Sequence, residues 1–149
     1  MAVVRDDPYS ALNFEVVFAG VFDDGKAVSG SFAEVFGLDV SIETIEYRNG
    51  SEDATVRKIP GLRKFTNITL KRGITGDLAF WNWTKAVMNG QVLRANGTIT
   101  LLDEARQPVM TWKIRRAWPC KLSGPALNAK GNDVAIETLE LCHEGLEIE

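Results

Sequence analysis

The chain has 149 residues, the length of one ordinary domain, and its 45% hydrophobic and 25% charged residues are typical of a soluble globular protein. Its formal net charge of −3 argues against a protein that holds nucleic-acid phosphates across a basic face. No run approaches the ~20 apolar residues that cross a bilayer, so we expect no membrane insertion by this chain.

The N-terminal segment, residues 1–12, is polar, contains Pro8 and lacks periodicity. It has no apolar run of the kind found in a signal peptide. We therefore expect a flexible arm.

Short runs in which apolar and polar residues alternate, bounded by turn residues, predict a mainly β protein. Pro119 is expected to end the sixth of these strands, because proline cannot donate to a β-ladder. The seven predicted strands are 13–21, 30–36, 38–47, 65–72, 98–103, 109–118 and 133–143.

Two of these strands alternate clearly, which predicts one dry and one wet face for each. In the strand 38–47 the wet positions are Asp39, Ser41 and Glu43. In the strand 65–72 they are Asn67, Thr69 and Lys71.

One helix is predicted over residues 77–89. Asp77 suits the helix N-terminus and Gly90 is a C-terminal stop signal. The stripe expected to pack against the sheet consists of Phe80, Trp83 and Val87 at i, i+3 and i+7, with Trp81 and Met88 widening it.

The segment 46–61 is predicted to project from the body as a loop. It contains the turn signal Asn49-Gly50, ends at Pro60-Gly61 and offers few apolar side chains to offset the entropy of ordering. Long projecting loops in compact domains tend to be functional. The fold class is therefore a single mainly β domain over residues 1–149, a small β-barrel or sandwich of about seven strands with one packed helix.

The sequence shows no catalytic, cofactor or metal site. His143 is the single histidine and has no nucleophile partnered to it. Cys120 and Cys142 match no metal or redox spacing, so we expect reduced, buried thiols, and whether they ever oxidise is left open. Four tryptophans are interpreted as core or subunit-contact residues. Enzymatic activity is not expected.

Several ordered motifs resemble the tail tube protein family of contractile phages and phage-like contractile injection systems. These motifs cover the chain from Asn13 onward. They are Glu46-Tyr47-Arg48-Asn49-Gly50, Lys58-Ile59-Pro60-Gly61, residues 68–73 (ITLKRG), Phe80-Trp81 with Trp83, Met110-Thr111-Trp112, Ala117-Trp118-Pro119 and Asn132-Asp133-Val134-Ala135.

The resemblance implies a non-enzymatic inner-tube subunit without cofactors, forming sixfold rings that stack into a tube. The implied partners are copies of itself, a contractile sheath protein, baseplate or hub and tube-terminating proteins, and DNA or protein cargo in the lumen. Assembly would take place in the cytoplasm, followed by incorporation into a phage tail or a phage-like particle, in some systems released outside the cell.

The resemblance also assigns roles to the residues singled out above. The wet-face residues Asp39, Ser41, Glu43, Asn67, Thr69 and Lys71 become candidates for the lumen lining. The segment 46–61 corresponds to the family loop that contacts neighbouring subunits. Candidates for contacts between subunits or rings are Tyr47, Arg48, Glu52, Asp53, Arg57, Lys58, Ile59 and Pro60.

Two other interpretations are carried forward. One is the secreted hexameric ring protein of a type VI secretion apparatus, which shares the fold. The other, from a different class, is a monomeric β-barrel module whose tryptophans line a ligand pocket. The sequence does not separate DNA from protein cargo, a phage from an injection system, or the main tube subunit from a paralogue at the tip, and it does not name the host.

Overall fold

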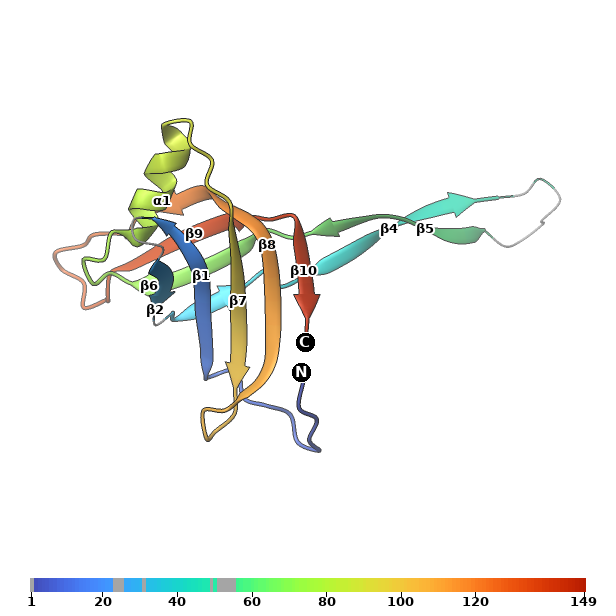
Figure 1. Cartoon of the computed structure of the whole chain (residues 1–149), viewed down its shortest axis with the longest axis horizontal. Coiled ribbons are helices and arrows are strands. Elements are labelled where there is room, and N and C mark those ends of the chain that lie inside the picture. Colours follow the sequence, from blue (N-terminus) through green and yellow to red (C-terminus); the bar gives the residue numbers. More distant parts are fainter. Residues whose placement is uncertain (1, 23–25, 31, 49, 51–55) are drawn as a thin grey trace.

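The computed structural model describes residues 2–22, 26–30, 32–48, 50 and 56–149. Within them the chain forms ten strands and one helix (Figure 1). The strands are β1 (Phe14–Phe22), β2 (Lys26–Gly30), β3 (Glu34–Phe36), β4 (Val40–Tyr47), β5 (Arg57–Phe65), β6 (Ile68–Gly73), β7 (Ala95–Leu102), β8 (Pro108–Ser123), β9 (Ile136–Cys142) and β10 (Gly145–Ile148). The helix α1 is Ala79–Met88.

The body is an open, sandwich-like arrangement of antiparallel strands. Its strand order is β2-β1-β7-β8-β9-β6-β3, with β10 added beside β8. β1, β7, β10 and the first part of β8 lie along a common axis with alternating direction, and β9 and β6 cross behind them (Figure 1). The mainly β prediction is confirmed. The barrel alternative is wrong, because the outermost strands β2 and β3 do not pair with each other in the described part of the chain.

The core lies between the two halves of this sheet and beneath the helix. Alternating side chains supply it, because successive residues of a strand point to opposite faces. In β6, Ile68 and Leu70 have no exposed surface, and in β9 the same holds for Leu139 and Leu141. The remaining buried members of this cluster are Val16, Phe18, Phe80, Trp83, Ala95, Ile99, Ile114 and Ala117.

The helix begins two residues later than predicted, and Asp77 accepts a hydrogen bond from the Ala79 N–H at 2.9 Å. Phe80 and Trp83 are 1% exposed, and the Trp83 indole N–H donates to the Leu93 carbonyl. Trp81 is 44% exposed, which contradicts its predicted place in the packed stripe. It follows Phe80 directly, and a one-residue step turns a side chain about 100° around the helix.

Strand β8 continues through Pro119, where the sequence predicted its end. A bulge lies between Pro119 and Lys121 in the ladder with β9. Bulges are among the few places where a strand accommodates proline, because the regular hydrogen-bond ladder is already interrupted there. β8 can therefore pair with β7 and β10 in its first part and with β9 in its last part.

A buried ion-pair cluster ties the helix to the sheet. The Arg72 guanidinium is 5% exposed and donates to Glu137 at 2.6 Å. It also lies 3.4 Å from the Asp77 carboxylate and 3.8 Å from the centre of the Phe80 ring. Because its partners come from β9, the turn before α1 and α1 itself, Arg72 holds three elements together.

The N-terminal arm lies against the turn between β7 and β8. Arg5 donates two hydrogen bonds to the Glu104 carboxylate, at 2.8 and 3.0 Å, and its guanidinium covers the Tyr9 ring. The Val3 N–H donates to the Val109 carbonyl. Among the described residues, no helix is long and apolar enough to span a membrane.

Candidate functional site

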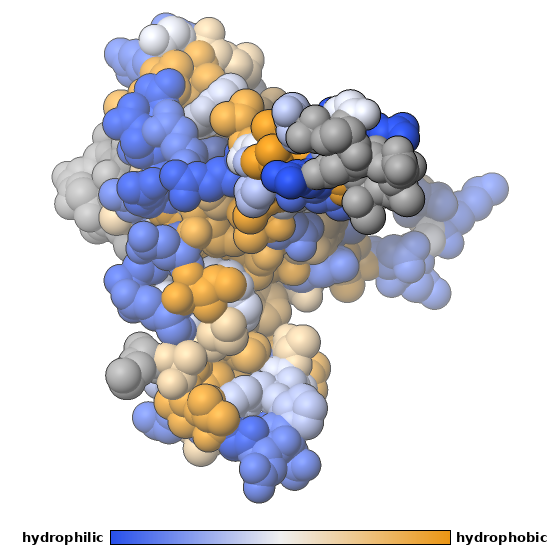
Figure 2. Space-filling view, turned by 90° about the vertical axis from the view of Figure 1, so that its right-hand side faces the viewer, coloured by the Kyte–Doolittle hydropathy of each residue, from blue (hydrophilic) through white to orange (hydrophobic). Residues whose placement is uncertain are grey.

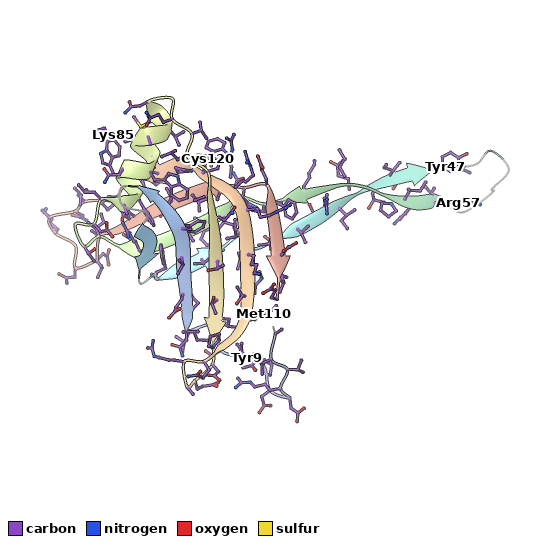
Figure 3. All side chains as sticks on the ribbon, in the orientation of Figure 1. Tyr9, Tyr47, Arg57, Lys85, Met110 and Cys120 are labelled. Atoms are coloured by element: carbon purple, nitrogen blue, oxygen red, sulfur yellow. The ribbon has the colours of Figure 1, made fainter. Side chains whose placement is uncertain are left out.

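The strands β4 and β5 form a two-stranded hairpin that projects from the body, separate from the main sheet (Figure 1). Tyr47 and Arg57 lie at its far end (Figure 3). Every residue of β4 is exposed, and in β5 all but Gly61 and Phe65 are. The segment predicted as a loop over 46–61 is thus the outer part of a hairpin whose walls are regular strands.

The apolar side of the hairpin changes face along its length. Near the body, Val40 and Ile42 are 56% and 62% exposed and share one face of β4. Near the tip, Ile45 and Tyr47 are 52% and 51% exposed and lie on the opposite face, where Ile59 pairs with Ile45. The change accompanies a bulge between Ile42 and Thr44 in the β4–β5 register. The hairpin therefore presents two apolar surfaces that point in different directions.

Polar side chains fill the complementary positions of the hairpin. Near the body, Glu43 forms an exposed ion pair with Lys64, on the same side as Ser41. Near the tip, Glu46 lies opposite Lys58. Figure 2 looks at the molecule from the hairpin side and shows hydrophilic and hydrophobic residues next to one another there.

The base of the hairpin is closed by one backbone hydrogen bond and contacts the body through one imidazole. The Thr66 N–H donates to the Asp39 carbonyl at 3.4 Å. The His143 ring lies between two carbonyl oxygens, with Nε2 2.9 Å from that of Thr66 and Nδ1 3.2 Å from that of Gly145. The Phe65 ring packs against this imidazole. Sequence reasoning gave His143 no particular place, because the meeting of residues 66 and 143 depends on the tertiary fold.

The structure gathers most of the predicted subunit-contact residues on the outer part of the hairpin. All of those that are described are exposed. They are Tyr47, Arg48, Arg57, Lys58, Ile59 and Pro60. Glu52 and Asp53 lie outside the described residues.

The predicted lumen residues fall into two groups on separate sheets. Ser41 and Glu43 belong to the hairpin, with Asp39 just before it. Thr69 and Lys71 lie on the face of β6 that points away from the core, with Asn67 just before the strand. Within this group the Asn67 amide donates to Glu140, and Lys71 lies 3.8 Å from Glu34. The expected dry face of strand 38–47 does not exist, because both faces of β4 are exposed.

The tryptophans do not converge on one ligand pocket. Trp83 is buried in the core and Trp81 is exposed on the helix. Trp112 lines a cavity of about 260 Å³ together with Phe14 and Leu38. Within the described ranges no three His, Cys, Asp or Glu side chains form a cluster that could hold a metal ion. The geometry thus directs attention to the projecting hairpin.

Comparison with solved structures finds close relatives of this fold. A chain of an extracellular contractile injection system, in the PVC sheath-tube complex in the extended state, is 31% identical with a TM-score of 0.82. The match covers 95% of this chain and 91% of that one. A chain in the tube terminating cap of the anti-feeding prophage is 28% identical with a TM-score of 0.84, covering 100% of this chain and 95% of that one.

A more distant structural similarity bears on the alternative that the chain is a ring protein of a type VI secretion apparatus. Hcp1 from Flavobacterium johnsoniae is 15% identical with a TM-score of 0.55, over 91% of this chain and 93% of that one, which shows a shared fold alone. No curated protein sequence gives a significant match.

The sequence profile of the T4-like virus tail tube protein gp19 matches residues 10–147. This match spans nearly the whole chain, and the PVC and anti-feeding prophage structures agree with it. The chain therefore belongs to the T4-like tail tube protein family and is a tube protein of the contractile-injection-system type.

Proposed function

We propose that this tube protein closes into sixfold rings that stack into the inner tube of an extracellular contractile injection system, with the β4–β5 hairpin as the main element between subunits. The ring order is taken from the family resemblance. The observation that carries the role of the hairpin is its pair of exposed apolar surfaces, Val40 with Ile42 and Ile45 with Tyr47 and Ile59.

An isolated subunit gains nothing from these surfaces. A two-stranded hairpin is marginally stable by itself in water, and exposed apolar patches usually mark interaction sites. Because the two surfaces face different directions, one neighbour cannot cover both. Contacts with two different neighbours, such as one in the same ring and one in the adjacent ring, would bury both.

Charge favours another copy of this chain as the neighbour. The hairpin strands carry four basic residues, Arg57, Lys58, Arg63 and Lys64, and two acidic ones, Glu43 and Glu46. The whole chain carries a net charge of −3. In a head-to-tail interface, a basic hairpin of one copy would meet the acidic body of the next.

The lumen-facing role of Asp39, Ser41, Glu43, Asn67, Thr69 and Lys71 belongs to the same proposal. What supports it is the polarity of both residue groups in the free subunit, where Asp39, Ser41, Glu43 and Asn67 are exposed and Thr69 and Lys71 are half-buried. A water-filled channel that passes a protein or DNA requires a polar wall. Acidic groups among them would keep a polyanion from adhering.

The partners proposed for the tube are a contractile sheath, a baseplate and a tube-terminating protein. The similar structures come from a sheath-tube complex and a tube terminating cap. We propose no catalytic role for this chain. We propose that it assembles in the cytoplasm and is then released as part of a particle. The cargo would be protein or DNA passing through the lumen.

The test is a double substitution at the tip, Ile45→Ser with Ile59→Ser. We expect wild-type protein to form rings or tubes in negative-stain micrographs and in native mass spectra. The double variant should remain monomeric, with a melting temperature close to that of the wild-type monomer, because neither side chain belongs to the core.

The matched control is Leu127→Ser, which removes an 84% exposed leucine from the connector before β9. It should assemble like the wild type. Tubes at wild-type yield from the Ile45→Ser, Ile59→Ser variant would contradict the role of the hairpin. A wild-type protein that stays monomeric at high concentration, even with tube-initiating components, would contradict the proposal as a whole.

A further inference from the structure

The two cysteines of the chain, far apart in sequence, meet at the ladder between β8 and β9. Trp118 pairs with Cys142, Pro119 with Leu141 and Lys121 with Glu140. Cys120 is the extra residue of the bulge and has no ladder partner of its own. Neighbouring strands lie only about 4.8 Å apart, so a bulged residue comes within reach of the side chains across the ladder.

The register of the ladder places the Cys120 thiol beside Cys142. Cys142 pairs with Trp118, two residues before the bulged Cys120, and it is close enough to influence the Cys120 thiol. The Cys120 Sγ also lies 3.4 Å from the Glu140 carbonyl oxygen and 3.8 Å from the Asn67 amide nitrogen. Cys120 is exposed and Cys142 is half-buried, and both are free thiols. The prediction that both are buried is therefore wrong for Cys120.

We propose that Cys120 and Cys142 are a modification site that closes to an intramolecular disulfide on exposure to a small disulfide such as oxidised glutathione. One thiolate of the pair attacks a sulfur of glutathione disulfide and expels one glutathione thiolate. The second cysteine then loses its proton and attacks the mixed disulfide, expelling the second glutathione. Two protein thiols are oxidised, one glutathione disulfide is reduced to two glutathiones, and the two protons pass to the released thiolates.

The site is built to close slowly. Although Cys120 reaches the surface, partial desolvation by its neighbours raises the pKa of its thiol to about 12, and the hydrogen bond and charge of Cys142 and the charge of Glu140 contribute in the same direction. Thiolates rather than thiols are the nucleophiles in this exchange. We therefore expect the rate of closure to rise about tenfold for each pH unit while the attacking group is mostly protonated.

The crosslink would join the last part of β8 to the end of β9, around the exposed connector of residues 124–135. It closes a loop of roughly 20 residues, and such a crosslink restricts the unfolded chain. A subunit that leaves a reducing cytoplasm for an oxidising medium would gain stability in this way. The inference concerns a single subunit and does not depend on the assembly proposed above.

In the experiment, the folded protein is treated with oxidised glutathione at about pH 7.5 and about pH 8.5, and its intact mass and free thiols are recorded. Both pH values lie below the raised thiol pKa, so the thiolate fraction should increase between them. We expect the wild type to lose the mass of two hydrogen atoms and both reactive thiols, faster at the higher pH. The oxidised protein should melt about 5–10 °C higher than the reduced protein. The variants Cys120→Ser and Cys142→Ser should show neither the mass loss nor the shift.

Three outcomes would overturn the proposal. In one, the folded wild type carries one or two glutathiones without closing, or stays unmodified. In the second, the mass loss occurs only in denaturant. In the third, the oxidised product is a crosslinked dimer, seen by non-reducing electrophoresis.

Discussion

The ladders β6–β9 and β4–β5 are both antiparallel and of similar length, yet they differ in what covers them. In the first, Ile68, Leu70, Leu139 and Leu141 have no exposed surface, because the opposite half of the sandwich packs over them. In the second, apolar residues stand on both faces and are at least 43% exposed at Ile42, Ile45 and Ile59. Backbone pairing alone contributes little net stability, since water can make the same hydrogen bonds. This difference in burial means that the body is stabilised by its own packing, whereas the hairpin needs contacts with other molecules to bury its apolar side chains.

The largest expected effect is in the body. Trp83→Ala should lower the free energy of unfolding by about 3–5 kcal/mol, because a large buried side chain is lost and a cavity remains. Trp81→Ala is the matched control, from the same helix but 44% exposed, and should cost much less. Denaturant titration of both variants measures the difference. Equal stabilities would show that the helix does not cover the core in solution.

Removing the buried cation should have the next largest effect. Arg72→Ala leaves Glu137, whose side chain is 17% exposed, without its 2.6 Å partner. We expect a loss of about 2–3 kcal/mol, below that of a fully buried pair because water can reach the carboxylate. The control is Lys71→Ala, the adjacent residue with a 3.8 Å exposed pair, which should change stability by less than about 0.5 kcal/mol. A cost at Lys71 as large as that at Arg72 would contradict this account.

On the hairpin, the polar positions should be far more tolerant of substitution than the apolar positions. Glu43→Gln removes an exposed ion pair with Lys64 and should change the unfolding free energy by no more than about 0.5 kcal/mol. Tubes should form at near wild-type yield, measured by sedimentation and electron microscopy. If this variant fails to assemble, Glu43 lies in a subunit contact and its lumen assignment fails.

The smallest expected effect concerns the attachment of the N-terminal arm. The hydrogen bonds from Arg5 lower the pKa of Glu104 from 4.5 to about 2. A depressed carboxyl pKa favours the folded state above the unfolded value, so the anchoring is complete above about pH 4.5 and is lost as pH falls toward 2. Hydrogen-exchange protection of the Val3 amide, which donates to Val109, should fall through this window. In Glu104→Gln it should already be low at neutral pH, and protection equal to the wild type would refute the anchor.

The sequence predicted the elements whose side chains alternate between water and core. β6 and the helix were found for this reason, since each has a regular apolar period. β5 was missed because Arg57–Phe65 has no dry face and contains Pro60-Gly61, which reads as a turn when neighbours are absent. The switch of apolar face along β4 could have been noticed, because Val40 and Ile42 occupy even positions and Ile45 and Tyr47 odd ones.

Features that depend on register were beyond the reach of sequence reasoning. The contact between Cys120 and Cys142 arises from one bulge in the β8–β9 ladder, and no spacing rule encodes it. The helical period placed Trp83 on the packed stripe, but the width of that stripe, and hence the exposure of Trp81, depends on the direction in which α1 faces the sheet.

The sixteen-residue strand β8 is shared by both halves of the sandwich. A force that pulls on β1 or β7 therefore reaches β9 and β6 along one continuous backbone, instead of crossing a packed interface that could slide. Neither half can open while the other stays intact without breaking ladders on β8, so the body should unfold in one cooperative step. In the stacked tube proposed above, such a common strand would make each subunit a stiff mechanical unit.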